Sequence, residues 1–273
     1  MPLLLYEIFW SHFCEKAAWC LDFKGLAYAR VRVNPFTRRE VRSLGKRGDV
    51  PVLKDGDRVV EGSGAIAAYL EARDPVPPLV PADPAGRAEV LAIQKRCDDV
   101  LGPDARCVAY HVALDHTALL EGTILFTRRP LRWLNAPFLR VVEPRLRRKF
   151  SIFENEVEDS RGRLRALLLD LQARLAGRGF LVGERPTLAD IAAASLMDPL
   201  EIVPEFVRDP AFAPLFGWKR RLAHEHHRPQ RSPWMAGPPP PGYPCLESRR
   251  ADRPVDPPAI RPADRSAAQR SGT

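Results

Sequence analysis

The sequence has 273 residues, 45% of them hydrophobic, with five cysteines and a formal net charge of +8. No apolar run is long enough to span a bilayer, and an odd number of cysteines without a C-x-x-C pair argues against a disulfide framework. The charge comes without a recognised nucleic-acid-binding motif, so we expect no nucleic-acid partner. The start MPLLLYEIFW lacks the charged region and cleavage site of a signal peptide, and we expect a cytoplasmic protein.

The first predicted element is a strand that leads into a helix at Ser11. The run from Leu3 to Trp10 is almost continuously apolar, as in a central strand buried on both faces. The helix that follows ends at Gly25, the expected left-handed cap. Because the free N–H groups and the positive dipole end of such a helix stabilise an anion, we expect a thiolate to bind near Ser11.

A second strand and a hairpin come next. Alternation predicts a strand over 27–33, and residues 51–60 predict a hairpin that Pro51 opens. A cis bond at Pro51 would turn the N–H and C=O of Val50 outward, where they could pair with an extended, peptide-like ligand. The alternative is an ordinary edge proline.

After the hairpin, Ser63 has two possible roles. It is either the N-cap of a helix over 64–72 or a ligand for a carboxylate, and both roles can coexist because a cap hydroxyl lies among free N–H groups.

The rest of the sequence predicts helices and a tail. A proline-rich stretch from Pro75 to Pro84 indicates a linker. Helical periodicity follows at 87–101, 104–120, 160–175 and 212–227. Gly102 and Pro103 are expected to close the first of these helices. Beyond residue 228 the composition of Pro, Arg, Ser, Ala and Gly predicts disorder.

One helix start carries a capping box. Thr187 can accept from the N–H of Asp190, whose carboxylate reaches back to the N–H of Thr187. We expect a structural role, worth about 1 kcal/mol or somewhat more for each side chain.

Two charged segments allow alternatives. Eight basic residues and one acid lie between 128 and 149 among aromatic residues. This segment could contact a membrane surface or an acidic partner, but we favour a connection between helices with a solvated basic face. The sequence HEHHR at 224–228 lacks the second histidine of H-E-x-x-H, so we expect no metal site and interpret it as a solvated helix end.

Four stretches together resemble the glutathione transferase superfamily: SHFCEKAAWCLDFKGLAY, DVPVLKDGD, SGAIAAYLE and RPTLADIAAASL. The resemblance covers about residues 1–228 and implies an α/β thioredoxin-like domain at 1–76, a linker at 77–86 and an all-helical bundle at 87–228, before the tail at 229–273.

The resemblance also implies a site. Ser11 occupies the position of the hydroxyl that hydrogen-bonds the thiolate in serine-type members. Cys14 is the alternative nucleophile, or a buried small hydrophobe. Glutathione binding is assigned to four residues, namely Val50, Pro51, Gly62 and Ser63.

Two of these positions depart from the family pattern. Gly62 replaces a Glu, Gln or Asp that meets the γ-glutamyl amine, and Asp49 replaces a Lys, Arg or Gln near the glycyl carboxylate. Lys46 or Arg47 could substitute for the missing base.

The implied function is conjugation of glutathione, or a related thiol, to a small apolar electrophile that binds between the two domains. The alternatives are a thiol-disulfide or lyase-type enzyme that uses Cys14, and a non-catalytic binding module. A homodimer is implied by the resemblance alone.

Overall fold

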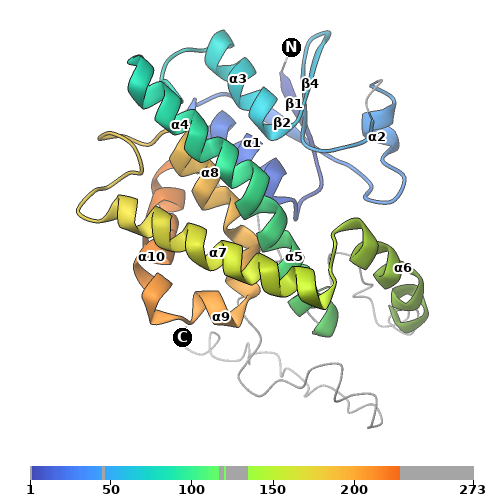
Figure 1. Ribbon diagram of the computed structural model, residues 1–273. Coiled ribbons are helices and arrows are strands. Elements are labelled where there is room, and N and C mark those ends of the chain that lie inside the picture. The colour runs from blue at the N-terminus through green and yellow to red at the C-terminus, as the bar shows by residue number, and fades with distance from the viewer. Residues whose placement is uncertain (1, 45–46, 117–119, 121–134, 228–273) are drawn as a thin grey trace, which may run out of the picture.

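The computed structural model describes residues 2–44, 47–116, 120 and 135–227, and Figure 1 shows how their elements are arranged. The predicted tail and the residues 121–134 lie outside this part of the chain, as do Lys46 and the fifth cysteine. Within the described residues, no helix is long and apolar enough to cross a membrane.

The N-terminal part is a four-stranded mixed sheet with three helices. Its strands are β1 (Leu3–Glu7), β2 (Tyr28–Arg32), β3 (Val52–Asp55) and β4 (Arg58–Glu61). Its helices are α1 (His12–Phe23), α2 (Arg39–Arg42) and α3 (Ser63–Arg73). The strand order is β2-β1-β3-β4, with β1 parallel to β2 and antiparallel to β3. The sheet and its helices confirm the predicted α/β architecture.

The central position of β1 is confirmed, but its two faces differ in burial. Leu3 and Leu5 are buried in the core that includes α1 and α3, whereas Leu4 and Tyr6 are half-buried. On the second face, Tyr6 packs against a smaller cluster that includes Val41 of the four-residue α2. After α1 the chain turns at Gly25 with φ of +64°, as predicted.

The second part is helical, and its first helix is not interrupted where the sequence predicts. The helix α4 (Pro84–Arg96) continues through a π-helical turn, Cys97–Leu101, into α5 (Gly102–Asp115). The expectation that Gly102 and Pro103 close a helix is therefore wrong. The π turn shifts the hydrogen bonds by one residue, so that the Gly102 N–H bonds to the Cys97 carbonyl and Pro103 fits into the first turn of α5.

The remaining elements complete the bundle. They are α6 (Asn135–Lys149), α7 (Glu154–Leu175), α8 (Leu188–Leu196), the 3-10 turn Asp198–Ile202, α9 (Pro204–Val207), the 3-10 turn Pro210–Phe212 and α10 (Ala213–His226).

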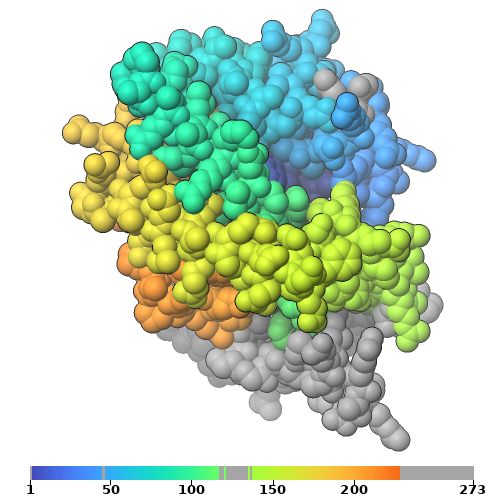
Figure 2. All heavy atoms as spheres, viewed as in Figure 1, coloured from blue at the N-terminus to red at the C-terminus, as the bar shows by residue number. Residues whose placement is uncertain are grey.

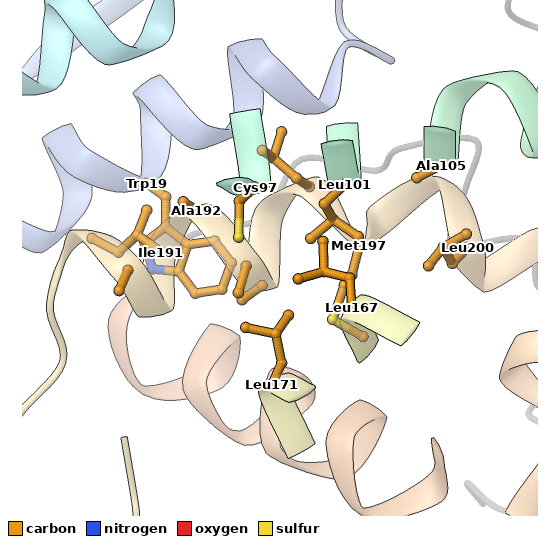
Figure 3. Close-up of a cluster of buried hydrophobic side chains, with 14 of the residues drawn as sticks. Trp19, Cys97, Leu101, Ala105, Leu167, Leu171, Ile191, Ala192, Met197 and Leu200 are labelled. Atoms are coloured by element: carbon orange, nitrogen blue, oxygen red, sulfur yellow. The ribbon is translucent and has the colours of Figure 1, made fainter. Parts of the chain in front are cut away.

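The two parts share one hydrophobic core. Figure 3 shows Trp19 of α1 close to Ile191 of α8, with Cys97 beside them and Leu171 of α7 facing the same cluster. The linker belongs to this core as well, since Leu79 is fully buried and its carbonyl accepts a 2.7 Å hydrogen bond from the N–H of Leu188. The site described below therefore lies between two parts that are packed together rather than loosely tethered.

The end of α10 differs from the expectation of a solvated helix end. The side chain of His227 is 2% exposed and lies between Glu15 and Asp22 of α1, with nitrogen–oxygen distances of 2.6 and 2.8 Å. Its ring stacks on Trp19 at 4.7 Å. Sequence alone could not reveal these partners, because more than 200 residues separate them from His227.

Candidate functional site

A cavity of about 460 Å³ opens between the sheet and the helices α5 and α6. Its N-terminal half consists of the β1–α1 connection, the segment before α2 and Val50, and its C-terminal half of α5, α6 and Phe150. An edge-to-face contact between Phe36 and Phe138, with centroids 5.8 Å apart, joins the two halves. In Figure 2 the dark-blue start of the chain is visible at the bottom of a hollow between light-blue and green surfaces.

Ser11 lines this cavity and is the N-cap of α1. Its Oγ accepts from the N–H of Cys14 at 3.4 Å, and its backbone carbonyl accepts from the N–H of Glu15 at 3.0 Å. No described residue bonds to the N–H groups of His12 and Phe13, which come first in the helix. The helix start at the cavity wall therefore carries one hydroxyl and two backbone N–H groups, a set of donors suited to an anion.

Cys14 lies on the other side of this turn, in the core. Its side chain is 1% exposed, and burial raises the pKa of its thiol to about 12, although a hydrogen bond with Ser11 opposes this effect. A thiol that is buried and protonated is a poor nucleophile. This geometry favours the interpretation of Cys14 as a small core residue.

Two further cavity residues hold the site in place without titrating near neutral pH. His12 places its Nε2 3.0 Å from the Gly102 carbonyl, and burial, with the nearby charge of Arg106, lowers its pKa to about 3. The neutral ring thus anchors the start of α1 to α5. The hydroxyl of Tyr110 accepts from Trp10 Nε1 at 3.0 Å, and burial raises its pKa to about 12.

The predicted cis bond is confirmed between Val50 and Pro51. Val50 lines the same half of the cavity as the start of α1, and no described residue bonds to its backbone N–H or C=O. The carbonyl of Pro51 accepts from the N–H of Gly62 at 2.9 Å, which fixes the hairpin end against the start of α3. An extended ligand edge is therefore available at Val50.

Gly62 and Ser63 lie at the start of α3 but do not line the cavity. Gly62 is the N-cap, with φ of +93°, and Ser63 is the first helical residue, only 5% exposed. The expectation that Ser63 caps the helix is therefore wrong, because the backbone turn occurs one residue earlier, where glycine permits positive φ. Next to this turn, Glu61 buries its Oε1 without a hydrogen-bond partner among the described residues.

Arg38 is a cavity residue that the sequence did not reveal. Its guanidinium bonds to the Gly48 carbonyl at 2.7 Å and to Asp49 at 3.0 Å. A positive charge thus lies beside Asp49, whose side chain is 78% exposed. Arg47 is exposed and does not line the cavity. The only signal for Arg38 was its place in a basic loop.

The C-terminal half of the cavity carries charge and aromatic surface. Arg106 and Tyr110 lie four residues apart on α5 and flank the ring of Phe150, the Tyr110 ring stacked on it at 5.2 Å and the guanidinium carbon of Arg106 4.6 Å from its centroid. Arg145 and Lys149 of α6 line the same cavity. The predicted basic segment therefore contributes two residues to the site, while Arg140 and Arg148 do not line the cavity.

The predicted capping box is confirmed. The Asp190 carboxylate accepts from the N–H and the hydroxyl of Thr187 at 2.8 and 2.9 Å, and also from the N–H of Leu181 at 2.8 Å. It lies away from the cavity. Among the described residues, no cluster of three or more His, Cys, Asp or Glu side chains is arranged to hold a metal ion.

Comparison with known proteins gives two family matches. Residues 5–78 match the N-terminal domain of glutathione S-transferase, and residues 134–225 match its C-terminal domain. Glutathione S-transferase Z2 of Arabidopsis thaliana is 36% identical over 85 residues, or 30% of this chain and 38% of that protein. The stringent starvation protein A homolog of Pasteurella multocida is 32% identical over 87 residues, or 32% of this chain and 41% of that protein. The chain thus spans about two fifths of the length of these relatives.

Solved structures share the fold over a longer range. The beta-etherase LigF of a Sphingobium strain superimposes with a TM-score of 0.63 at 22% identity, covering 82% of this chain and 95% of that one. FzlA of C. crescentus gives a TM-score of 0.58 at 25% identity, covering 89% and 95%. These two structures thus share the arrangement of a small mixed sheet and a helical part with this chain.

Proposed function

This chain belongs to the glutathione S-transferase superfamily, and on that premise we propose that it transfers the sulfur of glutathione to a small electrophile bound in the cavity beside Ser11. The observation that carries the proposal is that two features lie together in the N-terminal half of the cavity. The start of α1 presents a hydroxyl and free N–H groups, and Val50 presents an unpaired backbone edge next to a cis-proline.

The role of Ser11 follows from its position. Its Oγ accepts from the N–H of Cys14, and in our proposal its hydroxyl donates to the sulfur of glutathione in the cavity that Ser11 lines. Together with the N–H groups of His12 and Phe13, it favours thiolate over thiol, so the thiol proton passes to solvent when glutathione binds. The thiolate then forms a carbon–sulfur bond as the leaving group departs from the electrophile with the bonding electron pair.

Cys14 does not fit the same role. An enzyme that used it would need a thiolate in the dry core, where burial raises the pKa to about 12. We therefore favour Ser11 over the alternative of a cysteine-dependent enzyme.

The ends of glutathione require partners as well. In our proposal the Val50 backbone pairs with the peptide part of glutathione. Arg38 attracts the glycyl carboxylate, and its positive charge offsets the negative charge of Asp49. Ser63 and the start of α3 attract the γ-glutamyl carboxylate. The buried, unpaired Oε1 of Glu61 is an acceptor beside Gly62, where relatives place an acidic or amide side chain.

The test compares two substitutions. Replacing Ser11 by Gly removes the hydroxyl but weakens the helix cap by only about a few tenths of a kcal/mol. We expect Ser11→Gly to lower turnover of chlorodinitrobenzene by roughly a hundredfold, as for the loss of one anion-stabilising donor. Cys14→Ala, the matched control, is expected to retain most activity.

Binding is measured separately. Glutathione that binds the folded state must raise the unfolding temperature. If millimolar glutathione leaves that temperature unchanged and no conjugate forms, the enzymatic proposal fails and the non-catalytic binding module is favoured. If Cys14→Ala abolishes activity and Ser11→Gly does not, the cysteine-dependent alternative replaces it.

A further inference from the structure

The cavity carries an excess of positive charge. Among its described lining residues, Arg38, Arg106, Arg145 and Lys149 are basic, and Asp49 is the acidic one. Asp49 is already bound to Arg38 at 3.0 Å. Because the field of like charges adds up in a half-enclosed cavity, this one attracts anions.

Of the three basic residues that do not contact Asp49, Arg106 is half-buried, whereas Arg145 and Lys149 are exposed. The Nε of Arg106 is buried without a hydrogen-bond partner, and no described carboxylate forms a salt bridge with it. By contrast, Arg163 on α7 binds Asp104 through two nitrogens at 2.8 Å. Burial also lowers the pKa of Arg106, which indicates that its charge has lost water without gaining an acid. A guanidinium fork in this state is ready to bind a carboxylate in two-point contact.

Lys149 and the aromatic surface surround the same position. Lys149 ends α6 and lines the cavity, with its Nζ 5.4 Å from the centroid of Phe150. Phe13, Tyr110 and Phe150 supply flat apolar surface beside the two cations. Ser11 and Val50 belong to the opposite, N-terminal half, so Arg106 and Lys149 face the space left for the second substrate.

We propose that the second substrate is an aromatic electrophile with a carboxylate or an equivalent anionic group, which Arg106 and Lys149 bind while the ring packs on Phe13, Tyr110 and Phe150. This inference rests on the proposed function and narrows its substrate class. It changes the expectation from a wholly apolar electrophile to one with an apolar ring and a charged end. Burial of the ring stabilises the bound substrate, and the contacts of the charged end fix the orientation of the substrate towards Ser11.

The test uses an unreactive pair of probes, a dinitrobenzoate and the methyl ester of the same acid. Their dissociation constants are measured by calorimetry for wild type, Arg106→Leu and the control Arg140→Leu, which removes an exposed arginine of α6 outside the cavity. We expect wild type to prefer the acid. Arg106→Leu should reduce the acid-to-ester preference by about ten- to a hundredfold, the range for hydrogen bonds to a charged group, whereas Arg140→Leu should preserve it.

Lys149→Gln provides a second variant that cannot disturb the core, because Lys149 is exposed. It should reduce the same preference by a smaller factor. Equal binding of acid and ester by wild type, or a preference that survives both substitutions, overturns the inference.

A third measurement separates this inference from the proposed function. Binding of the acid is repeated with saturating S-methylglutathione, an unreactive form of the first substrate. Retained binding places the anion in the second-substrate half, whereas displacement of the acid overturns the inference. If S-methylglutathione binds and chlorodinitrobenzene is conjugated, but the protein binds the acid no more tightly than the ester, the inference alone fails. If neither glutathione nor S-methylglutathione binds, the proposed function fails.

Discussion

At the scale of single residues, the contact between α1 and α5 depends on the missing side chain of Gly102. A Cβ at this position would lie 2.5 Å from Cζ of Phe13, well inside van der Waals contact. The Gly102 carbonyl also holds His12 at 3.0 Å. The absence of a side chain therefore lets the start of α1, with Ser11, approach α5 closely enough to share a cavity.

We expect Gly102→Ala to destabilise the protein. The extra methyl group must displace the Phe13 ring, and such overpacking costs about 1–3 kcal/mol, which outweighs a helix-propensity gain of about 1 kcal/mol. Denaturant unfolding measures the difference. Gly162→Ala on α7 is the matched control, since its Cβ would meet nothing within 4 Å, and this variant should be more stable than wild type. Equal effects of the two substitutions would contradict the steric explanation.

Whether a site residue could be predicted from the sequence depends on how far along the chain its partners lie. Ser11 and the cis-proline at Pro51 were predictable, because a helix start and a hairpin start are local patterns. Arg38 and Arg106 were not, since their importance comes from what surrounds them in space. The role of Arg106 in the site depends on its contact with Phe150 and on the absence of a described acidic partner. The residues next to it in the sequence indicate neither.

At the scale of elements, the start of α8 shows how a local motif gains a long-range function. Asp190 is fully buried and accepts from Leu181 as well as from Thr187, so that it ties the preceding loop to the helix. The sequence predicted the capping box but not the bond to Leu181. For the same reason the break expected at Gly102 was wrong, because local residue preferences did not include the π turn and the packing of Phe13.

The two side chains of this capping box should therefore differ in their contribution to stability. Thr187→Ala removes one cap acceptor and should cost about 1 kcal/mol. Asp190→Ala leaves the N–H groups of Leu181 and Thr187 buried without acceptors, at about 1–3 kcal/mol each, so we expect a loss of at least about 2 kcal/mol. Chemical denaturation of both variants measures these values. Equal losses would show that the Leu181 bond contributes nothing.

At the scale of the whole molecule, His227 connects the end of the helical part to the helix that carries Ser11. Burial lowers the pKa of His227, but the hydrogen bonds and charges of Asp22 and Glu15 outweigh it and raise the pKa to about 9. For Glu15, burial raises the pKa, but the bond and charge of His227, with Arg30, outweigh it and lower the pKa. The imidazolium is thus the state that holds α10 against α1.

The contribution of the contacts between His227, Glu15 and Asp22 to stability should depend on pH in a definite direction. Because the folded-state pKa of His227 lies above the ordinary 6.5, its contribution is complete below pH 6.5 and disappears as the pH rises through about 9. The lowered pKa of Glu15 sets the other limit, since its contribution is complete above 4.5 and declines as the pH falls below that value. The shift of His227 corresponds to about 3 kcal/mol.

Unfolding free energies of wild type and His227→Gln, measured from pH 5 to pH 10, check this expectation. The difference between them should be largest at about pH 5–6 and shrink by about 3 kcal/mol towards pH 10. His224→Gln, which removes an exposed histidine of α10, is the matched control and should differ little from wild type in unfolding free energy. A difference for His227→Gln that stays constant across the range would mean that His227 is held as a neutral ring, and that stacking on Trp19 rather than charge joins the two ends of the fold.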